Sequence, residues 1–350
     1  MKRLFFRDKP IVGLDIGQTG AKIMGINTSN WHVLGYGSRA MDPVKLRESI
    51  ETGTDYLAIQ LKALLKNDLR GHLPSDRVVL SAPTGRTYGR IVTLPISAEK
   101  NLFEAVQLEA EQYIPVAVSE LNIDYEVVER TKDTVTALMS AVPKKIIESM
   151  VGACNKAGLD VVMVEPGLHA ISHLVVAAEE GKLPTIIADI GAASTNIAVF
   201  DNAIRITGGV QVGGNHFTLE IAKKFRITLE EAHDIKVKEG LKHGKRQAEM
   251  NEILVPQLQR ITAEIKKIMR YYEERLGSKK QIQQLLIVGG GSNMPEISSF
   301  FTNELMLPAR VAHPWGVIKF DPLQPPAKQY EPGFITAAGL ALMNPKEIWK

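Results

Sequence analysis

One short pattern occurs twice in this chain, and the repetition restricts the fold more than any other feature. Asp15-Ile16-Gly17 and Asp189-Ile190-Gly191 lie 174 residues apart, and each follows an apolar run and precedes a turn and a second apolar run. Aligning Asp15 with Asp189 also places Ile23 on Ile197. A glycine turn between two apolar runs predicts a strand–turn–strand unit. We therefore expect two similar α/β halves, each beginning with such a unit.

The composition is that of a globular protein and restricts its class. The chain has 350 residues, 45% of them hydrophobic and 23% charged, which is enough for two domains or one large split domain. A net charge of +3 does not indicate a nucleic-acid-binding protein. The single cysteine, Cys154, excludes an internal disulfide and a multi-cysteine zinc site and favours a reducing compartment. The sequence contains neither a leader-like apolar core at its start nor an apolar run of about 18 residues, which predicts a protein that does not span a membrane.

Hydrophobic spacing places the main elements between and after the two repeats. Apolar residues three or four positions apart predict helices over Ala98–Ile114, with Ser97 as its cap, and over Ile253–Leu276. Alternating patterns predict strands over Asn122–Glu129 and Val135–Val142.

Each glycine turn is suited to binding phosphate. A tight turn between two strands exposes backbone N–H groups, which donate to phosphate oxygens. The aspartates at the two turns, Asp15 and Asp189, are of the residue type that holds hydrated Mg²⁺ beside phosphate. Two hairpins that bind nothing are the alternative, because short turn motifs occur often without a ligand.

A third glycine-rich segment, Gly289–Pro295, follows the apolar run Leu286–Val288. Three consecutive glycines allow a ligand to approach the backbone closely. The residue three positions after Gly291 is Met294, so this segment is not a dinucleotide-binding fingerprint.

Together the three segments resemble the actin-like nucleotide-binding superfamily, which includes actin, the heat-shock chaperone ATPases, sugar kinases, MreB and FtsA. Asp15–Lys22 resembles its first phosphate loop, Asp189–Thr195 its second, and Gly289–Pro295 its adenosine loop. Glu165–Ala170 and Thr336–Gly339 resemble the two helices that connect the halves in that superfamily. The resemblance implies an α/β actin-like (ribonuclease H-like) fold of two similar halves, with ATP in the cleft between them.

The resemblance also implies roles for single residues. Asp15 and Asp189 are implied to serve Mg²⁺, and Glu165 resembles the glutamate that orients the attacking water in chaperone ATPases. A glutamate that only favours the positive end of a helix is the alternative for Glu165. Lys236 lies in a segment that resembles the adenosine-side helix of FtsA, where His233 replaces the usual glutamate. The other residues implied to contact ATP are Gly17, Gln18, Thr19, Lys22, Gly191, Ala192, Ser194, Thr195, Gly289, Gly290, Gly291, Ser292 and Met294.

An insertion in the first half narrows the family. Asn101–Pro115 contains the sequence EAVQLEAEQYIP, and Asp124-Tyr125 and Ala141–Lys145 follow it. These segments resemble the PilM family of type IV pilus assembly proteins, which is FtsA-like and has a subdomain 1C in place of actin subdomain 1B. The implied subdomains are 1A over 1–88 and 156–184, 1C over 89–155, 2A over 185–212 and 282–350, and 2B over 213–281.

A member of this family is implied to be a cytoplasmic scaffold of pilus biogenesis that is recruited to the cytoplasmic face of the inner membrane. It would bind the N-terminal cytoplasmic peptide of the membrane protein PilN in a groove between 1A and 1C, lined by Leu102, Val106 and Ile114, and couple its nucleotide state to assembly of the platform. The resemblance implies ATP turnover that is at most slow, contact with the membrane that is only indirect, and self-association as a further expectation.

Two other functions stay open. An FtsA-like cell-division scaffold usually ends in an amphipathic membrane helix, whereas Pro345 interrupts the end of this chain. A small-molecule kinase of the same superfamily needs a base aimed at a substrate hydroxyl, and the sequence does not identify one.

Overall fold

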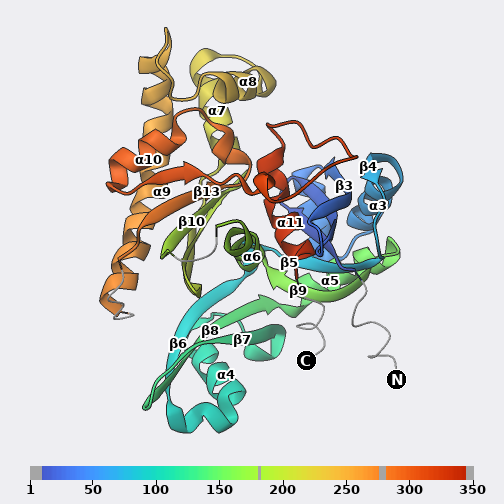
Figure 1. The fold of residues 1–350 in the computed structure, drawn as a ribbon, viewed down its shortest axis with the longest axis vertical. Coiled ribbons are helices and arrows are strands. Elements are labelled where there is room, and N and C mark those ends of the chain that lie inside the picture. The colour runs from blue at the N-terminus through green and yellow to red at the C-terminus, as the bar shows by residue number, and fades with distance from the viewer. Residues whose placement is uncertain (1–9, 180–182, 276–280, 344–350) are drawn as a thin grey trace. The chain divides into compact units, whose positions relative to one another are not determined.

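The computed structural model describes residues 10–179, 183–275 and 281–343 and divides the chain into two compact units (Figure 1). The first unit contains residues 10–179, 314–325 and 334–343, and the second contains 183–275, 281–313 and 326–333. Leu276, the expected end of the longest helix, and the two chain ends with Pro345 lie outside the described residues. Within the described residues, no helix combines the length and the apolar composition needed to cross a membrane.

The first unit is built on a six-stranded sheet. Its strands, in spatial order, are β4 (Leu69–Gly71), β3 (His32–Ala40), β2 (Gly20–Asn27), β1 (Val12–Gly17), β5 (Arg77–Ala82) and β9 (Asp160–Pro166). β1 pairs antiparallel with β2 and parallel with β5, and β5 pairs parallel with β9. The carboxyl ends of β1, β5 and β9 therefore meet at one edge of the sheet.

Helices cover both faces of this sheet because its strands carry apolar side chains on both sides. The helices of the first unit that pack on the sheet are α2 (Pro43–Thr52), α3 (Tyr56–Ala63), α5 (Lys144–Lys156), α6 (Gly167–Glu179) and α11 (Ile335–Ala341). Val78 and Leu80 share a core with α2, α3 and α5, whereas Val79, which points to the other face, shares one with α6 and α11. α11 approaches β1 so closely that a Cβ atom on Gly13 would overlap the carbonyl oxygen of Ala337.

The insertion forms a three-stranded antiparallel sheet with one helix on it (Figure 1). The strands are β6 (Tyr88–Pro95), β8 (Thr134–Pro143) and β7 (Leu121–Arg130), with β8 in the centre, and the helix is α4 (Leu102–Tyr113). The predicted strands are confirmed. The helix begins at Leu102 rather than Ala98, because residues 96–101 form 3-10 turns, and Ser97 therefore does not cap it.

The second unit is built on a five-stranded sheet. Its strands, in spatial order, are β12 (Ala203–Val210), β11 (Thr195–Asp201), β10 (Thr185–Ile190), β13 (Gln284–Val288) and β14 (Ala309–Val311). The helices are α7 (Gly214–Phe225), α8 (Leu229–Lys238), α9 (Gln247–Arg275) and α10 (Ile297–Leu305). The apolar stripe of α9, including Leu254, Leu258, Ile261 and Ile265, is buried in the core of this unit.

The repeat seen in the sequence is a repeat in the structure. β10 pairs antiparallel with β11 and parallel with β13, as β1 does with β2 and β5. Asp15 lies opposite Lys22 and Asp189 lies opposite Asn196, so the two hairpins have the same register. The expectation of two halves that each begin with the same hairpin is confirmed.

Two of the expected subdomain bounds need correction. Residues 144–155 were assigned to the insertion, but α5 packs against α2 and α3 and buries Ile146 and Met150 in the core of the first sheet. Residues 282–350 were assigned to the second half, but α11 packs against α6 and β1 in the first unit. In both cases an apolar helix face is buried against strands, including β1, that are distant in sequence.

Candidate functional site

The segment expected to be the first phosphate loop is the β1–β2 turn of the first unit. Gln18 is exposed at the turn, Thr19 and Gly17 are half-buried, and Gly20 has a φ of +151°, which favours glycine. A Cβ atom at Gly20 would also overlap the carbonyl oxygen of Arg39 on β3. Lys22 is half-buried and lies opposite Asp15 in the hairpin. The turn is therefore fixed by its neighbours while its tip stays accessible.

Asp15 is held by a residue that the sequence did not single out. The hydroxyl of Ser81, at the end of β5, donates to Asp15 Oδ1 at 2.8 Å and accepts the N–H of Ile16 at 3.1 Å. Ser81 is almost fully buried, at 2% exposure. The only sequence signal for this role is a serine that ends an apolar strand.

The segment expected to be the second phosphate loop, in the second unit, is hydrogen-bonded to the start of α7. The N–H of Gly214 donates to the carbonyl of Gly191 at 2.9 Å, and the N–H of Asn215 donates to that of Ala192 at 2.7 Å. The loop also closes on itself, since the N–H of Gly191 donates to the carbonyl of Ser194 at 2.9 Å. The first residues of α7 thus hold the second loop in place, and sequence reasoning missed this contact.

Three side chains expected to contact ATP are buried and make contacts within the second unit. The buried hydroxyl of Thr195 donates to the carbonyl of Val212 at 2.7 Å, and the buried hydroxyl of Ser292 donates to that of Gly289 at 2.7 Å. Met294 is buried in the core of the second unit. The three side chains thus stabilise the second unit, and contact of their residues with ATP stays a prediction.

The third loop packs on the end of β10, beside Asp189. Gly289 has a φ of +82°, and a Cβ atom there would overlap Asp189 Oδ1 and come within 2.7 Å of the carbonyl oxygen of Ile190. A Cβ atom on Gly291 would overlap the side chain of Ile190. At Gly290, by contrast, a Cβ atom would have no described atom within 4 Å. Gly289 and Gly291 are thus required by packing, whereas Gly290 borders open space.

Lys236 of α8 joins these loops. Its side chain is only 6% exposed, and Nζ donates to the carbonyl of Gly214 at 2.9 Å and to Thr218 Oγ1 at 2.8 Å. Burial lowers the pKa of the Lys236 ammonium to about 8. Burial, and secondly the charge of Lys236, lower the pKa of the nearby His233. A Cβ atom on Gly214 would lie 3.5 Å from Lys236 Nζ and 3.9 Å from Gly291 Cα, so α8, the α7 start and the third loop converge.

The burial of Lys236 predicts a rise in stability at alkaline pH. Between the folded pKa of about 8 and the ordinary value of 10.5, the unfolded chain binds more protons than the folded protein, so the free energy of unfolding increases with pH. At about 1.4 kcal/mol per pKa unit, the gain is about 3 kcal/mol across this window. Urea unfolding of the unsubstituted protein and of Lys236→Met from pH 7.5 to 10.5 tests this prediction. The difference in free energy of unfolding between the two proteins should grow as the pH rises.

Lys238→Met is the matched control, because Lys238 lies on the same helix but is exposed and paired with Asp234. The difference in free energy of unfolding between Lys238→Met and the unsubstituted protein should stay constant with pH. Parallel curves for Lys236→Met and the unsubstituted protein would show that Lys236 titrates at an ordinary pKa.

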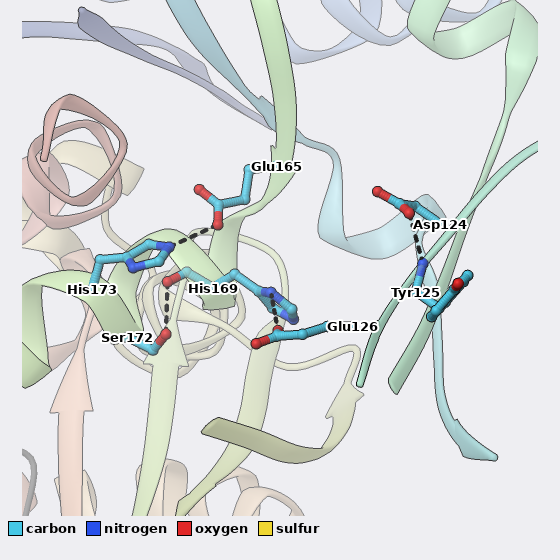
Figure 2. Close-up of polar contacts among 7 residues, drawn as sticks. All are labelled: Asp124, Tyr125, Glu126, Glu165, His169, Ser172 and His173. Atoms are coloured by element: carbon cyan, nitrogen blue, oxygen red, sulfur yellow. Dashed lines mark hydrogen bonds and ion pairs between the residues drawn. The ribbon is translucent and has the colours of Figure 1, made fainter. Parts of the chain in front are cut away.

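Glu165 lies at the carboxyl end of β9 in the first unit and is 5% exposed. Its Oε1 atom lies 2.8 Å from His173 Nε2, and its Oε2 atom is buried without a hydrogen-bond partner among the described residues. His169, one turn before His173 on α6, faces Glu126 of the insertion, with 3.9 Å between Nδ1 and Oε2 (Figure 2). Burial is the main cause of a lowered pKa at His169, opposed by the charges of Glu165 and Glu126.

The expected partner residues need correction. Leu102, Val106 and Ile114 are 5%, 0% and 7% exposed, and all three lie in the core between α4 and the insertion sheet. The apolar stripe of α4 therefore holds the insertion together and does not line an open groove. The exposed apolar side chains of α4 are Phe103, Leu108 and Tyr113.

No cluster in the described residues has three or more histidine, cysteine, aspartate or glutamate side chains placed to hold a metal. Asp15 and Asp189 therefore fit Mg²⁺ only as single carboxylates, with phosphate and water as the other ligands. Mg²⁺ in nucleotide sites is usually bound in this way.

Comparison with known proteins gives one family and several distant relatives. Residues 13–344 match the family described as type IV pilus assembly protein PilM. The chain is 23% identical to the cell division protein FtsA of Borreliella burgdorferi over 215 residues, which is 56% of this chain and 51% of FtsA. The chain thus spans about half the length of that relative.

Solved structures establish the fold. One is the PilM-PilN type IV pilus biogenesis complex, with a TM-score of 0.82, 24% identity, and coverage of 96% of this chain and 98% of that one. Another is MreB5 of Spiroplasma citri bound to ADP, with a TM-score of 0.54, 15% identity, and coverage of 98% of both chains. The expected actin-like α/β fold is confirmed.

Proposed function

Because the chain belongs to the PilM family of type IV pilus assembly proteins, we propose that it is a nucleotide-binding scaffold of pilus biogenesis. In this proposal it binds ATP and the N-terminal cytoplasmic peptide of PilN, and its nucleotide state biases assembly of the inner-membrane platform. The match across residues 13–344 carries the proposal. The alternative function in cell division is supported by similarity to FtsA proteins. The chain covers only 51% and 39% of the length of two of them.

Each unit provides groups suited to an ATP molecule, from the first hairpin in the first unit and from the second hairpin and the third loop in the second unit. The backbone N–H of Gly17 and the accessible Gln18 would bind phosphate oxygens, and the open space at Gly290 suits the adenosine. Lys236 adds a positive charge beside the second and third loops. Bound Mg²⁺ would neutralise phosphate charge, with Asp15 and Asp189 as its carboxylates. A relative with the same fold, MreB5, is known with bound ADP.

Glu165 is proposed to hold a water molecule with its unpaired Oε2 atom. A buried carboxylate oxygen without a partner is unfavourable, and a water or ligand would satisfy it. His173 holds the other oxygen, which leaves Oε2 as the atom to accept from water. A general base needs such a contact with the attacking water. We propose turnover that is at most slow, with binding rather than hydrolysis as the main role.

The partner peptide is proposed to bind along the junction between the insertion, here taken as residues 89–143, and the body of the first unit. A short peptide in a groove uses apolar anchors for affinity and backbone bonds for register. The membrane is then reached only through the partner, which would recruit the protein to the cytoplasmic face of the inner membrane. The same proposal includes association of the protein with further copies of itself.

Calorimetric titration tests the proposal directly. The full chain is titrated with Mg²⁺–ATP and, separately, with a synthetic peptide of the PilN N-terminus from the same organism. We expect a micromolar dissociation constant for the peptide, which corresponds to about −8 kcal/mol. A folded protein that binds neither ligand would rule out the scaffold function as stated.

Removal of either site aspartate is expected to weaken nucleotide binding. Asp15→Ala and Asp189→Ala each remove a carboxylate that serves Mg²⁺, so the affinity for Mg²⁺–ATP should fall about tenfold or more, equivalent to about 1.4 kcal/mol. Titration with ATP in EDTA should show little difference among the variants. Asp133→Ala, at an exposed turn of the insertion, is the control and should bind normally. Unchanged Mg²⁺–ATP affinity in both site variants would contradict the assignment of the two hairpins.

A further inference from the structure

A row of polar side chains runs along one edge of the first sheet. Ser81 on β5 donates to Asp15 on β1, and Ser81 lies opposite Glu165 in the parallel pairing of β5 with β9. Glu165 in turn contacts His173 on α6 at 2.8 Å. The carboxylate of Asp15 on β1 and the buried carboxylate of Glu165 on β9 thus lie at the same edge of the sheet, with Ser81 of β5 between their strands.

The row continues to the insertion. His169 lies one helical turn from His173, and its ring faces Glu126 on β7 (Figure 2). The side chain of His169 is 16% exposed and that of Glu126 is 56% exposed, so their contact lies where buried and solvated groups meet. The hydroxyl of Ser172 donates to the carbonyl of His169 at 2.8 Å, an ordinary bond within the helix.

The electrostatic environment of His169 depends in part on Glu126 of the insertion. Burial disfavours a charged His169, whereas Glu165 and Glu126 favour it, so the pKa of His169 responds to both carboxylates. Glu126 is the member of this set that the insertion supplies. Displacement of β7 would remove its charge from His169 and change the field at Glu165.

We infer that Glu126 and His169 couple the insertion to the first nucleotide loop, with His173 as the positioning residue of Glu165. This inference rests on the proposed function, because it describes how its two ligands communicate. Peptide bound at the junction alters the Glu126–His169 contact, and the change reaches Glu165 and the strand ends beside Asp15. By thermodynamic reciprocity, ATP alters peptide affinity by the same factor.

A binding cycle tests the inference. The affinity of the PilN N-terminal peptide is measured by calorimetry with and without saturating Mg²⁺–ATP, in the unsubstituted protein and in Glu126→Gln and His169→Gln. In the unsubstituted protein ATP should change peptide affinity about fivefold or more, the usual lower limit for coupled sites. In both variants that ratio should fall below about twofold, while affinity for ATP alone stays within about twofold of the unsubstituted value.

Asp124→Asn is the matched control. Asp124 lies two residues before Glu126 on the same face of β7 and is likewise exposed, but its Oδ1 accepts the N–H of Tyr125 at 2.8 Å, and Glu126 rather than Asp124 faces His169 (Figure 2). This variant removes the same charge from the same strand and should keep full coupling. The coupling ratio is a readout that a merely structural role would not change, because both single affinities are measured separately.

The outcomes separate the inference from the function. An unsubstituted protein that binds neither peptide nor ATP contradicts the proposed function itself. Binding of both without coupling, or coupling that persists in Glu126→Gln and His169→Gln, overturns the inference and leaves the function standing. Loss of coupling in Asp124→Asn as well would overturn it too, because the effect would then reflect only the charge of the strand. Circular dichroism confirms that each variant is folded.

Discussion

Replacement of Val106 by aspartate is expected to unfold the insertion. Val106 is fully buried, at 0% exposure, in the core formed by α4 and the β6–β8–β7 sheet. A carboxylate placed there loses its water without gaining a partner, which costs several kcal/mol. The lost packing of valine adds about 1 to 3 kcal/mol. Thermal unfolding followed by circular dichroism should show a large loss of stability, and peptide binding should disappear with it.

Leu108→Asp is the control for this change. Leu108 lies two residues later on α4 and is 63% exposed, so the same charge stays in water and stability should change by less than about 0.5 kcal/mol. A Val106→Asp protein with normal stability that fails to bind peptide would instead restore Val106 as a contact residue. The two variants therefore separate a core position from a groove position on one helix.

Replacement of Gly290 by valine is expected to abolish nucleotide binding in a folded protein. A Cβ atom at Gly290 has no described atom within 4 Å, so the first carbon of a new side chain meets no overlap in the protein without ligand. In the proposed site that space is occupied by the adenosine, and a branched side chain would block it. We expect at least about a hundredfold loss of ATP affinity, or about 3 kcal/mol, by calorimetry. The melting temperature without ATP should change little.

Gly289→Val provides the contrast, because its neighbours leave no space. The positive φ of Gly289 and the overlap with Asp189 and Ile190 predict a loss of stability even without ATP. Normal ATP affinity in Gly290→Val would mean that the third loop is only structural. Equal melting temperatures for the two variants would mean that the loop is not packed on β10 as described.

The hairpins were predictable because their pattern is local. A buried strand, a glycine turn and a second buried strand follow one another in sequence, so Asp15 and Asp189 fall at matching positions. The helix α9 was predictable for the same reason, since its apolar spacing is continuous. The partners of these residues were not, because Ser81 and Gly214 reach the loops through folding rather than through sequence proximity.

Val106 shows a second limit of sequence reasoning. An apolar stripe on α4 fits equally well a helix that packs on its own sheet and a helix that presents a groove. The structure decides between these two possibilities, because the stripe of α4 packs on the sheet of β6, β8 and β7. The same ambiguity affected α11, whose small residues do not reveal which unit they pack in. Its place against β1 follows from the close contacts at Gly13, and its place against α6 from those between Gly339 and Ala170.

The placement of α11 has a consequence for the order in which the protein is made. β1 is among the first strands synthesised, yet α11 (Ile335–Ala341), which covers it, follows the whole second unit in the chain. During translation, which proceeds from the N-terminus, the face of the first sheet that carries Ile11 and Val79 stays uncovered by Leu340 until nearly all of the chain has been made. The first unit therefore cannot complete its fold on the ribosome ahead of the second.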